Sequence, residues 1–202
     1  MRLTPLRGDL AQIADWVPQG ARVLDLGCGD GALLDWLQTH KNCHGYGAEI
    51  DHELVRHCLR RHVNVIRADI DQGLTLFTGN QFDVVILSQA LQATQRTEHV
   101  LQEMSRLGRE VIVSIPNFGH WTHIRSLLRG HMPVNQRLPY AWYDTPNRHF
   151  ATIKDFEALL GQLGLTITDR AYCIEQDHGG ITTIRIAPTL RATLALYRFA
   201  AR

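Results

Sequence analysis

The sequence predicts an α/β fold in which a mostly parallel sheet carries helices on both faces. Short apolar runs alternate with amphipathic stretches between residues 9 and 115, which is the pattern of repeated strand–helix–strand units. The run from Val84 to Leu87 is wholly apolar, as expected of a strand covered on both faces. One early strand leads straight into three closely spaced glycines and then a helix, which is typical of a nucleotide-binding sheet.

The elements can be placed in order along the chain. Asp9 is expected to cap a first helix that ends at Pro18. Strands are then expected at residues 22–26, 45–49, 63–68, 82–87 and 110–115. The stretches between them hold apolar residues at helical spacing, namely Leu33, Leu34 and Leu37; Leu54, Val55, Cys58 and Leu59; and Val100, Leu101, Met104 and Leu107. These stretches are therefore expected to form helices that each bury one face against the sheet.

Beyond residue 115 the pattern changes. A helix is expected over 118–128, ended by Gly130. Residues 131–150 show no clear period and are rich in proline and aromatic residues, so a functional loop or lid is expected at about 117–150. Thr152 is expected to cap a helix that ends at Gly164. The last strands are expected at residues 165–173 and 195–200, with residues 181–186 as a competing strand.

Length and composition exclude several classes of protein. The 202 residues suit one domain, and 21 basic residues against 20 acidic ones give no footprint for nucleic acid. No apolar run approaches the roughly 18 residues of a membrane span, and the first residues lack a secretory apolar region. The four cysteines form no CxxC pair, so reduced thiols in a cytoplasm are expected rather than disulfides or a zinc site.

The residues that carry chemistry begin with the glycine turn. Gly27, Gly29 and Gly31 lack a Cβ and therefore let backbone N–H groups approach a ligand closely. The helix that follows points its positive N-terminal end at the same place. The glycine spacing alone is weak support, because the dinucleotide pattern G-x-G-x-x-G also accepts the alanine found at Ala32.

Two acids beside the turn decide between ligands. Asp25 lies two residues before the first glycine and Asp30 lies between the last two, and both would repel the pyrophosphate of a dinucleotide. S-adenosylmethionine (SAM) carries adenosine, a sulfonium and an ammonium but no phosphate. We therefore expect SAM, or S-adenosylhomocysteine, at this turn. An NAD-dependent oxidoreductase is the alternative that fits the fold but not these acids.

Two further acids end the next two strands. Glu49 lies 22 residues after Gly27, near the spacing of about 20 at which an acid accepts hydrogen bonds from ribose hydroxyls. Asp69 follows the expected third strand, where it can accept a hydrogen bond from an adenine amino group. The alternative for Glu49 is a surface acid at a strand end, and for Asp69 it is an ordinary turn residue.

Up to Ile115 the order of these signals resembles the class I SAM-dependent methyltransferases. The resemblance implies a Rossmann-like, seven-stranded sheet whose last strand is antiparallel. It implies that the methionine part of SAM is held by Asp25, Gly27, Cys28, Gly29, Asp30 and Gly31. It further implies that Glu49 binds the ribose, Ile50 the adenine face and Asp69 the adenine amine. Leu87 and Ser88 would border the sulfonium and its methyl group.

A narrower resemblance spans nearly the whole chain. The themes at residues 6–16, 114–121 and 138–149 resemble the MetW family of methionine-biosynthesis proteins, and the third is the most specific. The C-terminal region departs from the family, with Pro188-Thr189-Leu190 in place of its Pro-Asn-Leu theme. The resemblance implies a cytoplasmic protein that supports homoserine O-acyltransferase, whether this partner transfers acetyl or succinyl.

No motif diagnostic of a methyl-transfer reaction is present. His120, Tyr143 and His149 are the candidates for a catalytic role. The structural alternatives are that His120 caps or packs a helix, that Tyr143 fills the core and that His149 only bonds to the backbone. Two histidines, His120 and His123, lack a third ligand, and no metal is expected. The two hypotheses are therefore a SAM-binding module whose aromatic loop contacts a partner, and an active methyltransferase with an unidentified acceptor.

Overall fold

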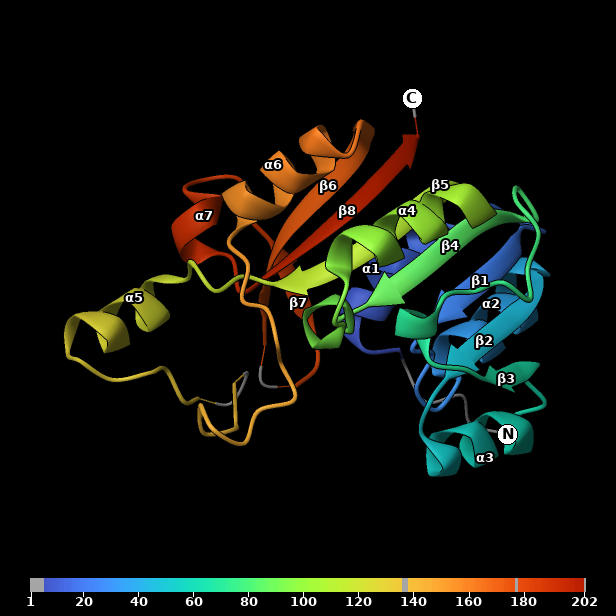
Figure 1. Cartoon of the computed structure of the whole chain (residues 1–202), viewed down its shortest axis with the longest axis horizontal. Coiled ribbons are helices and arrows are strands. Elements are labelled where there is room, and N and C mark those ends of the chain that lie inside the picture. Colours follow the sequence, from blue (N-terminus) through green and yellow to red (C-terminus); the bar gives the residue numbers. More distant parts are fainter. Residues whose placement is uncertain (1–5, 136–137, 177, 202) are drawn as a thin grey trace.

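The computed structural model describes residues 6–135, 138–176 and 178–201. An eight-stranded sheet with the order β3-β2-β1-β4-β5-β8-β6-β7 runs through these residues (Figure 1). Its strands are β1 (Arg22–Leu26), β2 (His44–Glu49), β3 (Val65–Arg67), β4 (Phe82–Ser88), β5 (Gly108–Pro116), β6 (Leu165–Glu175), β7 (Ile181–Thr183) and β8 (Leu194–Ala201). The helices are α1 (Gly8–Trp16), α2 (Ala32–Lys41), α3 (His52–Arg60), α4 (Thr97–Leu107), α5 (Trp121–Leu128), α6 (Ile153–Gln162) and α7 (Pro188–Arg191), with single turns η1 (Ile70–Gln72) and η2 (Leu91–Ala93).

The first five strands are parallel, as the sequence predicts. β8 is antiparallel to both β5 and β6, which confirms the expected antiparallel last strand. The expected count of seven strands was wrong, because Ile181–Thr183 pairs with the end of β6 as an eighth, edge strand. Gly179 adopts a positive φ of 80° in the turn between them, so the chain can fold straight back onto β6.

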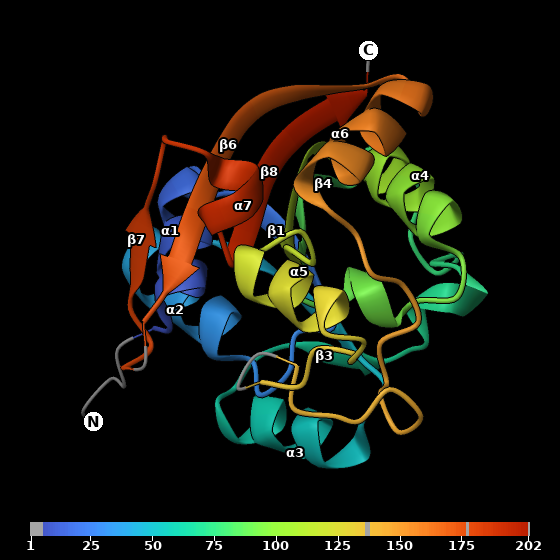
Figure 2. The same cartoon turned by 90° about the vertical axis from the view of Figure 1, so that its left-hand side faces the viewer.

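Helices cover both faces of the sheet, as expected (Figure 2). Along β1, Val23 belongs to the core packed under α1 and α2, whereas Leu24 belongs to the core packed under α4 and α6. Neighbouring residues of a strand point to opposite faces, so two fully buried neighbours require a layer on each side. The carboxyl ends of the parallel strands are thereby left as the edge where a ligand can enter.

Two helix starts differ from the expectation. Asp9 does not cap α1, because the helix begins at Gly8 and Arg7 is its N-cap residue. Asp9 lies in the first turn with its side chain buried, where Arg7 binds it. α5 begins at Trp121 rather than near residue 118, because the His120 ring accepts a hydrogen bond from the Thr122 amide and caps the helix there. Thr152 caps α6 as predicted.

The segment between α5 and α6 leaves the sheet and returns to it (Figure 1). Asn135 and Leu138 form an isolated antiparallel bridge. The backbone amides of Arg148 and His149 donate to the Gln92 carbonyl at 2.8 and 3.1 Å, which fixes the returning chain to η2. Within the described ranges, no helix is both long enough and apolar enough to cross a membrane.

Candidate functional site

The glycine turn joins β1 to α2 at the carboxyl edge of the sheet. Gly27, Gly29 and Gly31 have φ angles of 66°, 58° and 76°, a region that favours glycine. The amides of Gly27 and Cys28 donate to the Ala48 carbonyl at 2.8 and 3.2 Å, which folds the turn against the end of β2. A Cβ added at Gly29 would meet nothing within 4 Å, so this side of the turn is open to a ligand.

Glu49 ties the end of β2 to this turn. One carboxylate oxygen accepts from the Gly29 amide at 2.9 Å, and the other accepts from the amides of Ile50 and Asp51 at 2.8 and 3.0 Å. A carboxylate offers about four acceptor sites. Three are used within the protein, and the remaining one lies on the oxygen that holds Gly29. Glu49 therefore shapes the turn and keeps one acceptor for a ligand hydroxyl.

Asp25 is a buried acid without a partner. Its side chain lies at the end of β1 and is 3% exposed. None of the described residues donates a hydrogen bond to it. Burial, with a smaller contribution from the negative charge of Glu49, raises the pKa of Asp25 to about 8. A cationic group placed beside this carboxyl would offset the cost of ionising it, because an opposite charge favours the charged form.

Asp30 differs from the expectation that it adds free negative charge to the turn. Its carboxylate binds the Arg61 guanidinium at 2.7 Å and accepts from the Ala32 amide at 3.2 Å. Arg61 therefore offsets the charge of Asp30. The carboxyl beside the glycines that has no partner among the described residues is that of Asp25, with Glu49 next to it.

Cys28 is a packing residue of the turn. Its sulfur lies 3.8 Å from the sulfur of Cys58, and burial raises its pKa. A Cβ added at Gly47 would lie 2.4 Å from that sulfur, so Cys28 fills the space above β2. A buried thiol with a raised pKa is a poor nucleophile, which favours the packing role over a reactive one.

The remaining residues expected at the cofactor site are dispersed. Ile50 is 57% exposed at the mouth of the turn, whereas Leu87 is fully buried in the core and presents no surface. Asp69 caps η1, accepting from the Asp71 amide and from the Gln72 side chain at 3.0 and 3.1 Å. Ser88 belongs to a separate polar network.

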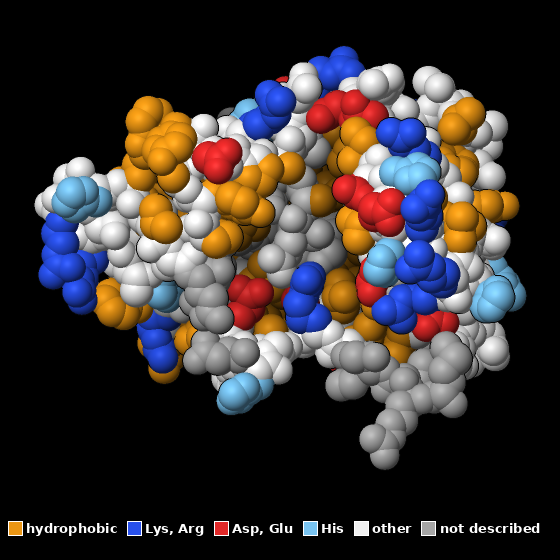
Figure 3. Space-filling model, turned by 90° about the horizontal axis from the view of Figure 1, so that it is seen from below, with side chains coloured by type: hydrophobic (Ala, Val, Ile, Leu, Met, Phe, Trp, Pro, Cys, Tyr) orange, Lys and Arg blue, Asp and Glu red, His pale blue; other side chains and the backbone are white. Residues whose placement is uncertain are grey.

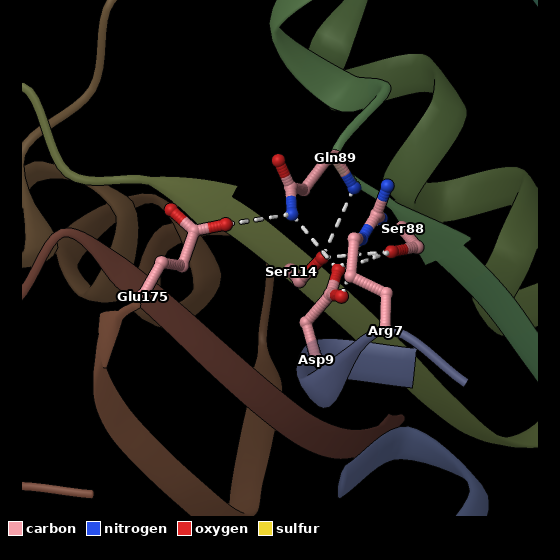
Figure 4. A network of polar contacts seen from close by, with 6 residues as sticks. All are labelled: Arg7, Asp9, Ser88, Gln89, Ser114 and Glu175. Atoms are coloured by element: carbon pink, nitrogen blue, oxygen red, sulfur yellow. Dashed lines mark hydrogen bonds and ion pairs between the residues drawn. The ribbon is translucent and has the colours of Figure 1, made fainter. Parts of the chain in front are cut away.

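That network closes the ends of β4 and β5 on the face covered by α1 (Figure 4). Its members are Arg7, Asp9, Ser88, Gln89, Ser114 and Glu175. Arg7 holds Asp9 with two hydrogen bonds of 2.6 and 2.8 Å, and Gln89 donates to Asp9 at 2.8 Å. Burial alone would raise the pKa of Asp9, but these hydrogen bonds outweigh it and the pKa lies below its usual value.

The sequence did not reveal this network as a site. Arg7 and Asp9 belong to the opening theme that resembles the MetW family, which was the available signal. Gln89, Ser114 and Glu175 come from three other strands or strand ends, and only the folded sheet brings them to Asp9.

A cavity of about 690 Å³ opens on the opposite face of the same edge. η2 and the start of α4, the end of β5, the start of α6 and the segment after α5 form its walls, with Phe118, Phe150 and Phe156 among the lining side chains. His149 also lines it. His120 instead caps α5, and Tyr143 is 77% exposed on the outer surface. Among the described residues there is no group of three or more potential metal ligands.

Comparisons with known proteins identify the family. The sequence profile described as "Methionine biosynthesis protein MetW" matches residues 7–199. This chain belongs to the MetW family. The chain is also 35% identical over 209 residues to the "Bifunctional methionine biosynthesis protein MetXA/MetW" of Rhodopirellula baltica. The match covers 96% of this chain but 33% of that protein, so the MetW chain spans about a third of its relative's length.

Solved structures establish the fold. A SAM-dependent methyltransferase from Thermotoga maritima matches with a TM-score of 0.71 at 14% identity, covering 96% of this chain and 88% of its own. One from Archaeoglobus fulgidus matches with a TM-score of 0.69 at 16% identity, covering 95% and 90%. The MetW chain therefore has the Rossmann-like fold of SAM-dependent methyltransferases, with an added edge strand.

Proposed function

We propose that this MetW chain binds SAM at the glycine turn and, with SAM bound, supports a homoserine O-acyltransferase in methionine biosynthesis. The observation that carries the proposal is Asp25, a buried carboxyl beside an open turn with no protein partner among the described residues. An unpaired buried acid is costly unless something compensates it. A ligand with a positive centre supplies that compensation.

The chemistry of the donor set fits SAM. Asp25 and residues 27–31 would hold its methionine part, including the ammonium. The remaining acceptor site of Glu49 would take a ribose hydroxyl, and Asp69 would accept from the adenine amine. Bound SAM would supply an activated methyl group on a sulfonium. A dinucleotide fits less well, because its pyrophosphate would lie against Asp25 and Glu49.

The partner is supported by the relative in Rhodopirellula baltica, whose name joins MetXA and MetW in one bifunctional protein. Two activities combined in one chain are held close together without a separate association step. In the present chain we propose one SAM-binding domain over residues 1–202, with the segment at about 117–150 as a lid or contact region. Four free cysteines agree with a reducing cytoplasm as its location.

The test is an acyltransferase assay with purified components. The rate of acyl transfer to homoserine is measured with and without the MetW chain, and with and without SAM. We expect the chain to change the rate or the stability of the acyltransferase, and SAM to alter that change. An Asp25→Asn variant should keep the SAM-independent part and lose the SAM response. An acyltransferase indifferent to the chain under all four conditions would contradict the proposal.

A second candidate function is methyl transfer to a small, mostly apolar acceptor, and the 690 Å³ cavity favours it. The cavity has the size and apolar lining of a small-molecule site, and His149 in its wall could accept a proton from the acceptor. Formation of S-adenosylhomocysteine that depends on an added acceptor, and that falls in a His149→Ala variant, would establish this function.

A further inference from the structure

α5 and the segment after it carry several large apolar side chains that the other described residues leave exposed. We define the α5 surface as the exposed apolar side chains of α5 and of the segment that follows it, namely Trp121, Leu127, Leu128, Val134, Trp142 and Tyr143. Leu128 is 84% exposed, and Trp142 and Tyr143 are 70% and 77% exposed. α5 projects from the carboxyl edge of the sheet (Figure 1), and this end of the molecule shows hydrophobic and basic side chains together (Figure 3).

The α5 surface is the outer layer of an anchored segment. Its inner layer is held against the fold, because His123 and Leu138 are buried and His149 is fixed to Gln92 through its backbone amide. Phe118 and Phe150, at the two ends of this segment, contact each other with ring centroids 4.7 Å apart. The outer side chains are therefore presented from a defined position and are not required for closing the core.

α5 is too short to be stable without packing its apolar face against another surface. α5 has eight residues, and His123 is its buried member. Isolated helices shorter than roughly 12–15 residues are marginal in water, and most helical stability comes from packing an apolar face. A contiguous exposed apolar patch on such an element marks an interaction site. Trp is also among the residues that most often dominate binding energy in interfaces.

The charge of the region indicates what covers it. No Asp or Glu occurs in the sequence from residue 111 to residue 143, whereas Arg125 and Arg129 flank the apolar residues of α5. A complementary partner surface is acidic. A second copy meeting the same face would bring the same positive charges against it. A membrane is less suitable, because binding to a bilayer scales with the apolar area that a helix buries, and α5 has only eight residues to offer.

We propose that the α5 surface is the docking site for the acyltransferase, and that it meets an acidic patch with apolar pockets on that enzyme. This inference rests on the proposed function, since it names the place where the two proteins meet. The exposed Trp142 and Leu128 are the anchors, and Arg125 and Arg129 steer the approach. The SAM turn lies elsewhere on the sheet edge, so docking and SAM binding are separable by mutation.

The first test measures the affinity of full-length variants for the immobilised acyltransferase. Leu128→Glu places a negative charge where the partner is acidic, and we expect binding to weaken by at least about tenfold. Trp142→Ala should have a similar effect. Leu76→Glu is the matched control, because Leu76 is 78% exposed on the loop before β4. The affinity of this variant for the acyltransferase should stay within about twofold of wild type. SAM affinity should be unchanged in all three variants.

The second test separates steering from packing. The double variant Arg125→Glu and Arg129→Glu should lower the association rate at low salt by at least about tenfold and flatten its dependence on salt. Arg56→Glu on α3 is the control with an exposed arginine far along the chain from α5, and its association rate should match that of wild type.

The outcomes distinguish this inference from the proposed function. If wild type does not bind the acyltransferase, the proposed partnership fails, and the docking site fails with it. If wild type binds and the α5 variants bind equally well, the docking site alone is overturned. Self-association of wild type that Leu128→Glu abolishes, or wild-type binding to phosphatidylglycerol vesicles in place of the acyltransferase, would also overturn the assigned occupant.

Discussion

Replacing Asp25 by asparagine should make the protein more stable at alkaline pH while weakening its binding of SAM. The carboxyl is buried without a protein partner among the described residues, and its pKa is raised to about 8 from an ordinary value of 3.8. Between these two values the folded state holds a proton that the unfolded state has lost. Stability therefore falls as pH rises through this window.

The magnitude follows from the width of the window. Each pH unit in which the two states differ by one proton is worth about 1.4 kcal/mol. From pH 5 to pH 8, wild type should lose about 4 kcal/mol of stability through Asp25. Asparagine does not titrate, so Asp25→Asn should not show this loss. The difference in unfolding free energy between variant and wild type should thus grow by about 4 kcal/mol across the range.

Urea unfolding at pH 5, 6, 7 and 8 measures this difference, and titrations common to both proteins cancel in it. Asp83→Asn is the control. The hydrogen bond from Arg22 holds the pKa of Asp83 at about 2, below its ordinary value of 3.8. Its contribution is therefore lost only as pH falls through that lower window. From pH 5 to 8, the stability difference between Asp83→Asn and wild type should stay constant.

Calorimetry completes this test. SAM binding to wild type at pH 6–7 should release protons, because a cation beside Asp25 favours its ionised form. Asp25→Asn should release fewer protons and bind SAM about 1.5–3 kcal/mol more weakly, which is roughly 10–150-fold. Parallel stability profiles for the variant and wild type, together with equal SAM affinity, would refute the assignment of Asp25 as an unpaired ligand-binding acid.

Two other changes test the turn. Glu49→Gln should weaken SAM binding by about 1–3 kcal/mol and also lower stability, because an amide cannot accept from all three backbone N–H groups. The control is Glu53→Gln, which changes an exposed acid of α3. In the same calorimetry it should change the free energy of SAM binding by less than about 0.5 kcal/mol. Gly47→Ala should lower the free energy of unfolding, measured with urea, by about 1–3 kcal/mol, because its Cβ would lie 2.4 Å from a buried sulfur. Gly161→Ala is the control: a Cβ at this helical position meets nothing within 4 Å, so the free energy of unfolding should rise by about 0.5–1 kcal/mol.

The sequence predicted the parts of the fold that depend on local pattern. The parallel strands and their covering helices followed from apolar periodicity, and the turn at Gly27 followed from glycine spacing. Thr152 was predicted correctly as a cap because its partner Asp155 lies three residues away. In each case the signal lies within one or two neighbouring elements.

The features that escaped prediction depend on residues far apart in the chain. Asp9 was predicted as a cap because its sequence neighbours suit one, but Gln89, 80 positions away, helps to hold it in a buried site. Arg61 offsets Asp30 across 31 positions, so the charge of the turn could not be read from the turn alone. The cavity beside His149 exists because α4, β5 and α6 converge there.

The central claim is that the turn after β1 binds a cationic adenosyl compound without phosphate. An NMR titration that follows the backbone amides of Gly27, Gly29 and Gly31 tests it most directly, with SAM and then NAD added to the same protein. We expect saturable shifts of these three amides with SAM and none with NAD at equal concentration. Saturable shifts with NAD, or SAM-dependent shifts confined to another part of the chain, would contradict it.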